Sequence, residues 1–520
     1  MNTYITSRKD DYRALQMILP LEVGVQIPED DPLHTFLKVV EGMNLRRYVR
    51  RHSGRGRHGY DPVRMLEIIL FAYMNQIYSL RQMEHACRTD LRFLYLTGEE
   101  TPSFQTIGQF ITKNLKGTVE DVFTDLNRRI FELDGICLDE LYVDGTNYEA
   151  NANKYSFVWK KTALKSQEKE ILRINEKLGI LEELFAEYGA EVRPVRTSEE
   201  AEKYLAVLDA VMKEVCLEKK YGKGRHKTTL QRYYDQLRAD TDKLRECEKR
   251  IRICGEERNS YSKTDPDATF LHMKYDYYCH TGVFKPGYNV QFGISDEYIS
   301  VLQVSPARTD SRTLPATLEQ FRKQYGRDPR TLIADAGYGS YNNYIFCLSR
   351  RIAACVKYST WEKERSGRHT GTYDSGNFRY EPDHMICPQG KILELEKEIS
   401  SEDQGILKFT RHYRCHECGN CPHRAECTKS ESGRTVQYNP ILQELKENAR
   451  RLLESERGKE LRERRSIYSE GAFGIVKQDY EYVRIHRRGR ENVRTEVTLI
   501  AIGFNLMKYH NKSHRLALMN

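Results

Sequence analysis

Apolar residues recur at helical spacing in the N-terminal part of the chain. Pro62 suits a first helical turn, and the run VRMLEIILFAYMNQ that follows is apolar most of the way round, as in a buried helix. Ser79 and Ser103 are suitable N-caps for LRQMEHACR and FQTIGQFITKN. Short helices joined by tight turns predict a helical domain over residues 1–130 that either reads DNA or forms a dimerisation bundle.

Helical periodicity returns on a strongly charged background. KSQEKEILRINEKLGILEELF and LQRYYDQLRADTDKLRECEKRIRI place apolar residues at helical spacing, with breaks near residues 189–198 and 222–227. This pattern predicts a helical, coiled-coil-like insertion over residues 158–262. Its role is expected to be structural or DNA-supporting.

Strand-like patterns lie on both sides of that segment. ICLDELYVDGTNY is apolar and β-prone, and Gly145 should end or bend the strand. YNVQFGI and YISVLQV are β-rich and flank the turn SDE; a helix, the strand TLIA, another helix and the strand AACVKYS follow. A hairpin followed by alternating helix and strand predicts a mixed α/β sheet. The corresponding domain comprises residues 131–157, 263–360 and 440–510.

Composition limits the class of protein. A chain of 520 residues is expected to form two to four domains, and its 39% hydrophobic and 30% charged residues are typical of a soluble globular protein. No apolar run approaches the roughly 20 residues of a membrane span. The stretch MNTYITSRKDDYRA has no apolar signal-peptide core, so export is not expected and a cytoplasmic location is.

The formal net charge of +8 is concentrated in two basic clusters, RRYVRRHSGRGR at 46–57 and RIHRRGR at 484–490. Such clusters suit phosphate backbones, where Lys and Arg displace condensed counterions. A solvated surface is the alternative for either cluster. The candidate DNA contacts are Arg46, Arg47, Arg50, Arg51, Arg487 and Arg488.

Two aspartates follow apolar strands. Asp144 and Asp335 each lie at or just past a predicted strand end, where ligand and catalytic groups of open α/β sheets collect. Two carboxylates brought together raise each other's proton affinity unless a cation neutralises them. Carboxylate oxygens suit Mg²⁺ or Mn²⁺, and two such ions about 3.5–4 Å apart support phosphodiester chemistry. The alternative is that each aspartate simply caps a turn.

Five of the 13 cysteines gather within residues 361–439, which we expect to form a small Cys-rich insertion. The spacing is Cys415-x2-Cys418-x2-Cys421-x5-Cys427, with Cys387 upstream. Four thiolates would complete a structural Zn²⁺ site, with Cys387 or a histidine (His412, His416, His423) as a substitute ligand. Free thiols remain an alternative. An iron–sulfur cluster is another, although the x5 spacing departs from bacterial ferredoxins.

Several motifs carry a family resemblance over residues 35–510. GRHGYDPVRMLEIILFAYMNQIYSLRQMEHACRTDLRFLYLTG and TPSFQTIGQF resemble an InsH-type N-terminal domain. YVDGTNYEANANK, DPDATFLH, KPGYNVQFGIS, TLIADAGYGSYNNY, RRSIYSEGAFGIVK and FNLMKY follow in order. Together they resemble bacterial insertion-sequence DDE transposases, specifically the 1182-type branch.

The resemblance implies an RNase H-like catalytic domain with insertions. It places Asp144 on the first, central strand, Asp335 after the fourth strand and Glu470 on a later helix, with two Mg²⁺ ions as cofactor. Acidic rivals stand nearby: Asp139, Glu140, Glu149, Glu460 and Glu463.

The third acidic motif departs from the wider group. The chain has Glu470-Gly471-Ala472-Phe473-Gly474 in place of Glu-Pro-Val-Phe-Gly, which predicts a looser helix start. Lys477 lies seven positions after Glu470, about two turns along the same helix face. With Arg464 and Arg465 before the glutamate, Lys477 is a candidate phosphate contact.

The resemblance implies an enzyme that cleaves DNA at the ends of its element and joins them to target DNA. Its partners would be double-stranded DNA (terminal inverted repeats and target) and a second copy of itself bound to that DNA. Its expected location is the cytoplasm, in association with the nucleoid. The alternatives are a catalytically impaired DNA-binding relative and a metal-dependent RNase H-like nuclease.

Overall fold

The computed structural model describes residues 4–7, 15–18, 27–49, 59–98, 100–222, 226–256, 258–273, 282–366 and 371–519. The chain divides into two compact units. The first comprises Met1–Thr118, Arg128–Asp134 and Ile502–Asn520, and the second Val119–Asn127 and Gly135–Ala501. The helices α6 (Val119–Asp134) and α18 (Arg490–Met519) contribute to both units.

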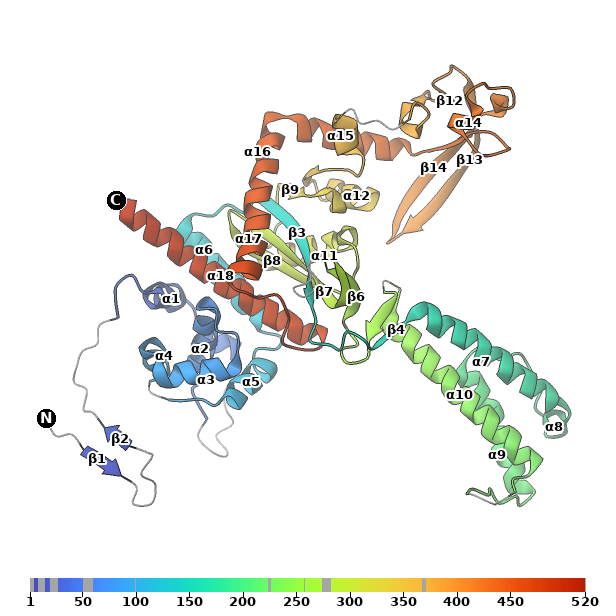
Figure 1. The fold of residues 1–520 in the computed structure, drawn as a ribbon, viewed down its shortest axis with the longest axis horizontal. Helices are drawn as coiled ribbons and strands as arrows, with labels where there is room; N and C mark the ends of the chain where they lie inside the picture. Colours follow the sequence, from blue (N-terminus) through green and yellow to red (C-terminus); the bar gives the residue numbers. More distant parts are fainter. Residues whose placement is uncertain are drawn as a thin grey trace. The chain divides into compact units, whose positions relative to one another are not determined.

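The first unit is helical, as predicted (Figure 1). The helix α2 (Pro62–Met74) is buried along most of its length. The ring of its Phe71 packs between Phe36 and Phe93, with centroid distances of 5.4 Å to Phe36 and 5.2 Å to Phe93. Ser103 caps α5 by accepting a hydrogen bond from the Thr106 amide, whereas Ser79 precedes α3 without a side-chain cap. The elements of this unit besides α6 and α18 are β1 (Tyr4–Ser7), β2 (Leu15–Ile18), α1 (Pro32–Glu41), η1 (Leu45–Tyr48), α2 (Pro62–Met74), α3 (Leu80–Thr89), α4 (Leu91–Thr97) and α5 (Phe104–Lys113).

The second unit is built on a mixed sheet of six strands, which confirms the predicted α/β class. The strands are β3 (Glu140–Glu149), β6 (Thr269–Met273), β7 (Val283–Ser295), β8 (Tyr298–Ser305), β9 (Thr331–Ala334) and β10 (Ala353–Val356). Their order is β10-β9-β3-β7-β6. β6 pairs with the first part of β7, up to Gly287, and β8 pairs with the rest, from Asn289 to Ser295. β9 runs parallel to β3 and to β10, whereas β7 is antiparallel to its three neighbours.

Gly145 does not end β3, contrary to one of the two expectations for it. The strand continues to Glu149 because β7 pairs with it from Tyr142 to that residue. Asp144 therefore lies within the strand rather than at its end.

The second unit also contains the helices α11 (Leu314–Tyr325), α12 (Tyr341–Ser349), α15 (Pro440–Glu454) and α16 (Glu456–Arg465).

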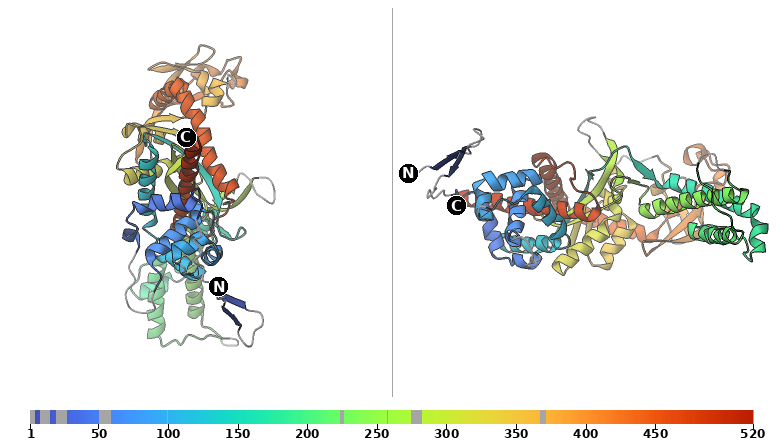
Figure 2. Two further views of the ribbon diagram at one scale, coloured as in Figure 1. Left: turned by 90° about the vertical axis from the view of Figure 1, so that its left-hand side faces the viewer. Right: turned by 90° about the horizontal axis from the view of Figure 1, so that it is seen from below.

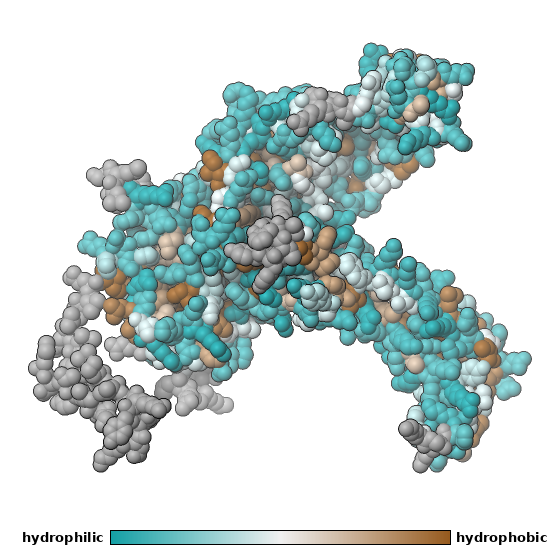
Figure 3. Space-filling view, in the orientation of Figure 1, coloured by the Kyte–Doolittle hydropathy of each residue, from teal (hydrophilic) through white to brown (hydrophobic). Residues whose placement is uncertain are grey.

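The predicted helical segment forms a group of helices with a hydrophobic core of its own. Its helices are α7 (Lys160–Ile180), α8 (Glu182–Glu187), α9 (Ser198–Glu214) and α10 (Thr229–Cys254), with both predicted breaks in place. α7 and α10 lie side by side in both views of Figure 2, around a core that includes Ile174, Phe185 and Leu237. The outer face of these helices is mostly hydrophilic (Figure 3). The strands β4 (Phe157–Trp159) and β5 (Ser260–Ser262) pair at the base of the segment.

The Cys-rich residues contain a five-stranded antiparallel sheet that the sequence pattern did not indicate. Its strands, in spatial order, are β11 (Arg379–Tyr380), β12 (His384–Ile386), β13 (Ile392–Asp403), β14 (Ile406–Arg414) and β15 (Thr435–Tyr438). β13 and β14 form a long hairpin with mostly exposed side chains, so little of it shows the alternation of a half-buried strand. The short helices of this region are α13 (Trp361–Arg365), η4 (Ser375–Asn377), η5 (His416–Cys418) and α14 (Arg424–Cys427).

Glu470 lies inside a helix rather than at its start. Helical structure runs on from α16 through the π-helical η6 (Ser466–Glu470), α17 (Gly471–Gly474) and the π-helical η7 (Ile475–Asp479). The prediction of a loose helix start at Gly471 is therefore wrong, because the helix begins at Glu456. None of the helices in the described part of the chain is both long and apolar enough to cross a membrane.

Candidate active site and Cys-rich site

Asp144 and Asp335 are brought together by strand register. The parallel strands β3 and β9 pair from Glu140 with Thr331 up to Val143 with Ala334. Asp144 and Asp335 are the next residues on the two chains, so they occupy neighbouring positions at the end of this pairing. Each side chain also accepts a nearby backbone N–H, from Gly145 and Gly337 respectively, at 2.8 Å.

The carboxyl of Asp144 has an altered proton affinity. Burial is the main cause that raises its pKa to about 6, and the charges of Asp335 and Asp310 raise it further. The Gly145 N–H and the Arg465 guanidinium act in the opposite direction. The surroundings of Asp144 therefore disfavour its negatively charged form, and a bound cation would stabilise that form.

Glu470 is linked to Asp144 through Arg465. One guanidinium nitrogen of Arg465 lies 3.6 Å from the Asp144 carboxylate, and the other lies 3.8 Å from Glu470. Arg465 is largely buried, whereas the Glu470 side chain is 67% exposed. A positive charge thus stands between two of the three predicted acidic residues.

Aromatic contacts hold the Glu470 helix on the sheet. Phe473 stacks on Phe292, the β7 residue opposite Asp144, with ring centroids 4.7 Å apart. Tyr468 packs edge-on against Tyr142 at 5.1 Å. Because these rings flank Glu470 in sequence, they fix the helix on the face of β3 that carries Asp144.

Four of the five acidic rivals of the predicted residues form ion pairs with other side chains. Asp139 forms an ion pair with Arg327 at 2.8 Å, Glu149 with Lys285 at 2.7 Å, and both Glu140 and Glu460 pair with Arg457. Arg465, by contrast, forms its ion pairs with the predicted residues Asp144 and Glu470.

Asp310 is a further acidic residue at this place, and the sequence reasoning missed it. It begins the short helix η2 (Asp310–Arg312), and its Oδ1 accepts hydrogen bonds from Asn289 at 2.8 Å and Gln291 at 3.0 Å. The buried Tyr338 hydroxyl donates to Gln291. Only the position of Asp310 shortly after a β-rich run hinted at a role, and many surface aspartates share that position.

Gly145 makes this arrangement sterically feasible. A Cβ at this position would lie 2.1 Å from Nε2 of Gln291 and 2.8 Å from Oδ1 of Asp310. Both side chains approach the backbone of β3 directly beside Asp144. The glycine is therefore required by close approach rather than by a turn.

The basic residues around Glu470 bind within the protein. Lys477 donates to Thr146 Oγ1 at 2.6 Å and to the Asn147 carbonyl at 3.2 Å. Arg464 pairs with Glu460 at 2.5 Å. Lys477 therefore helps to hold the helix on β3, whereas the Arg464–Glu460 pair lies within one helix.

The basic segment at 484–490 is anchored by one buried carboxylate. Glu496 on α18 accepts hydrogen bonds from the Tyr482 hydroxyl and from the backbone amides of His486 and Arg487, at 2.7–3.0 Å. Arg488 donates to the Asn151 carbonyl at 2.7 Å. The candidate contacts Arg46 and Arg47 are exposed on η1 in the first unit, whereas Arg50 and Arg51 lie outside the described residues.

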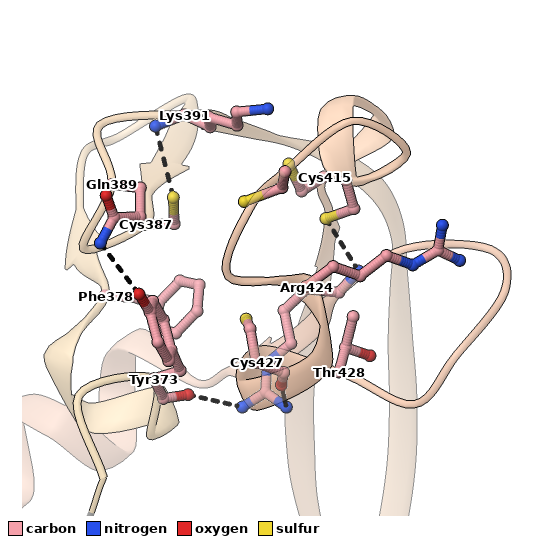
Figure 4. Close-up of a pocket in the computed structure, with 12 residues that line it drawn as sticks. Tyr373, Phe378, Cys387, Gln389, Lys391, Cys415, Arg424, Cys427 and Thr428 are labelled. Carbon is pink, nitrogen blue, oxygen red and sulfur yellow. Dashed lines mark hydrogen bonds between the residues drawn. The ribbon is translucent and has the colours of Figure 1, made fainter.

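The five predicted cysteines line one pocket of the Cys-rich sheet (Figure 4). Burial raises the pKa of Cys415 to about 11 and also raises the pKa of Cys427. Within the described residues, no three His, Cys, Asp or Glu side chains lie close enough to hold a metal ion as a set, here or at the aspartates. The five cysteines therefore share a pocket, but three of them do not form a ready metal-binding set among the described residues.

Two family models match the chain. A transposase DDE domain matches residues 386–510, and a transposase domain (DUF772) matches residues 21–113. The two matches support an insertion-sequence DDE transposase. The match to the transposase DDE domain includes Glu470 and the five cysteines, whereas Asp144 and Asp335 lie outside both matches. No curated protein and no solved structure gives a significant match.

Proposed function

We propose that the chain cleaves DNA at the ends of its element and joins the freed 3′-hydroxyl to target DNA, using Asp144, Asp335 and Glu470. The observation that carries this proposal is the register of β3 and β9, which makes the two aspartates neighbours. The Arg465 contacts to Asp144 and Glu470 add the third carboxylate to the same site.

An RNase H-like catalytic fold is part of the proposal. The strand order β8-β7-β3-β9-β10 supports it, with β3 central, β7 antiparallel and β9 parallel to β3. The proposal assigns Asp144 on the central strand and Asp335 directly after its parallel neighbour to the two aspartate positions that the family resemblance implies.

The chemistry of the donor set fits Mg²⁺ or Mn²⁺, since both ions prefer carboxylate oxygens. Asp144, Asp335 and Glu470 would hold the metal. Two bound ions would activate the attacking oxygen and stabilise the leaving oxygen. Asn289 and Gln291 hold the Asp310 carboxylate next to the pair, where its charge adds to the local negative potential.

Double-stranded DNA is the proposed partner, and two copies of the chain would pair two element ends. The proposed contacts are Arg46, Arg47, Arg50, Arg51, Arg464, Arg465, Lys477, Arg487 and Arg488. Arg465 contacts the Asp144 and Glu470 carboxylates and Lys477 donates to Thr146 of β3, so both also hold the helix that carries Glu470 against the sheet.

The products formed from end DNA test this function. Duplexes that carry the sequences flanking the reading frame are incubated with the protein, Mg²⁺ and a supercoiled target plasmid. Nicked ends together with joined end–target products are expected. Hydrolysis products alone would replace the proposal with an RNase H-like nuclease, and tight end binding with no nicking would replace it with an impaired DNA-binding relative.

A further inference from the structure

The five clustered cysteines come from two segments that flank the β13–β14 hairpin. Cys387 follows β12 and precedes β13, while Cys415, Cys418, Cys421 and Cys427 follow β14. All five line the same pocket (Figure 4). The pocket therefore lies at the base of the hairpin and joins the chain entering it to the chain leaving it.

Two of these sulfurs accept backbone hydrogen bonds. The Lys391 amide donates to Cys387 Sγ at 3.3 Å, and the Arg434 amide donates to Cys418 Sγ at 3.4 Å. Gly390, at φ +77°, shapes the tight turn that points the Lys391 amide back at Cys387. Hydrogen bonds of this kind from the backbone orient a side chain that serves as a metal ligand.

The apolar core under this sheet is small. Its buried members other than cysteine are Phe378, Met385, Leu393, Tyr413 and Val436. Several large apolar side chains of the hairpin are instead exposed, among them Leu395, Leu407 and Phe409. A small module with so little core commonly takes part of its folding free energy from a bound metal.

We propose that this pocket binds one structural zinc ion, with Cys387 and Cys418 as two of its four thiolate ligands. Two of the three remaining cysteines complete the tetrahedral set, and the fifth is spare. The hydrogen bond from the Lys391 backbone N–H to its sulfur favours Cys387 as a ligand. From the sequence spacing alone, Cys387 was expected only as a substitute ligand.

The zinc ion would fix the base of the hairpin and thereby the position of its tip. At the tip, the Asn342 side chain donates to Asp403 at 3.1 Å and the Tyr341 hydroxyl donates to the Leu407 carbonyl at 3.2 Å. Both donors lie in α12, the helix that follows Asp335. The site is independent of the proposed catalytic chemistry, since it uses none of its carboxylates.

Metal analysis of the purified full chain tests the proposal. Close to one zinc ion per chain is expected for the wild type and for the controls Cys137→Ser and Cys216→Ser, whose exposed cysteines lie outside the cluster. Cys387→Ser and Cys418→Ser should each lose the zinc, and one of the three other cluster variants should keep it. A wild type without metal or with iron, or a Cys387→Ser variant that keeps its zinc, would overturn the proposal.

Two measurements on the wild type avoid any dependence on variant folding. Titration with a mercurial thiol reagent should release the zinc in step with four thiols. Removing the metal with a chelator should speed protease cutting within residues 392–414, and re-adding zinc should reverse this. Zinc released without thiol modification, or unchanged cutting after chelation, would contradict the site. Neither measurement involves DNA, so the outcome is separate from that of the proposed function.

Discussion

Asp144 and Asp335 directly follow the paired residues Val143 and Ala334 on two parallel strands. They are 191 positions apart in sequence (335 − 144), and one register brings them together. The antiparallel register of β3 with β7 places Asp144 opposite Phe292, whose ring stacks on Phe473 of the helix that carries Glu470. The arrangement makes several properties of the site measurable.

Gly145→Ala should disturb the site from within the strand. The added methyl group would clash with Gln291 and Asp310, so we expect a loss of about 1–3 kcal/mol of stability together with slower cleavage. Thermal unfolding and a cleavage assay give the two readouts. Gly179→Ala in α7 is the control, because its Cβ meets nothing within 4 Å and should be neutral or stabilising. Equal behaviour of the two variants would refute the steric role of Gly145.

The pH dependence of metal-supported cleavage should report on Asp144. Its pKa is raised to about 6, so the carboxylate that binds metal is lost as the pH falls through that value. Removing the positive charge in Arg465→Gln should raise this pKa and move the fall in cleavage rate to higher pH. Arg457→Gln, which breaks ion pairs with Glu140 and Glu460, should leave the profile in place. A profile that is identical for Arg465→Gln and the wild type would contradict the coupling.

Glu496→Gln should loosen the segment that carries Arg487 and Arg488. Burial alone raises the pKa of Glu496, but hydrogen bonds from His486 and Tyr482 outweigh it and hold the pKa below its ordinary value. The substitution should lower the Tm by about 4 °C or more at pH 7, because hydrogen bonds to a charged group are lost.

The sign of the pH effect follows from the lowered pKa. The contribution of the Glu496 carboxylate is present above the ordinary carboxyl pKa of about 4.3 and is lost as the pH falls through the lower folded value. The difference in Tm between wild type and variant should therefore shrink below about pH 4.3. Glu454→Gln, at an exposed helix end, is the matched control. A Tm difference that does not change with pH would argue against this carboxylate as the anchor.

The salt dependence of DNA binding tests the basic segment itself. Replacing Arg487 and Arg488 with Ala should reduce the slope of log K against log salt concentration by about 2, with similar weakening for any DNA sequence. Arg193→Ala, in an exposed ion pair with Glu191, should leave the slope unchanged. Weakening confined to one DNA sequence would instead indicate base contacts.

The local sequence pattern was sufficient to predict helices and strands that do not depend on a distant partner. The burial of α2, the breaks around α9 and the short strand β9 were all predicted from periodicity and turn residues. Pairing was not predictable, because nothing near Asp144 specifies that β9 rather than another strand lies beside it. Asp310 was missed for the same reason: its partners Asn289 and Gln291 belong to a different strand.

Other features depended on context that local rules do not carry. β13 is rich in Glu and exposes most of its side chains, so its pairing with β14 rather than a buried face defines it as a strand. Gly471 reads as a poor start for a helix, yet it lies in the interior of one that begins at Glu456. Cys387 was separated from the other cysteines by the hairpin, and folding returns it to their pocket.

Single-turnover cleavage of end DNA in Mg²⁺ by Asp144→Asn and Asp335→Asn tests the central claim most directly. Each variant should cut more than about 100-fold more slowly than the wild type, because a carboxylate ligand is lost, while binding the same DNA almost as tightly. Asp139→Asn, whose carboxylate pairs with Arg327, should cut at nearly the wild-type rate. Undiminished cleavage by both Asp144→Asn and Asp335→Asn would contradict the account.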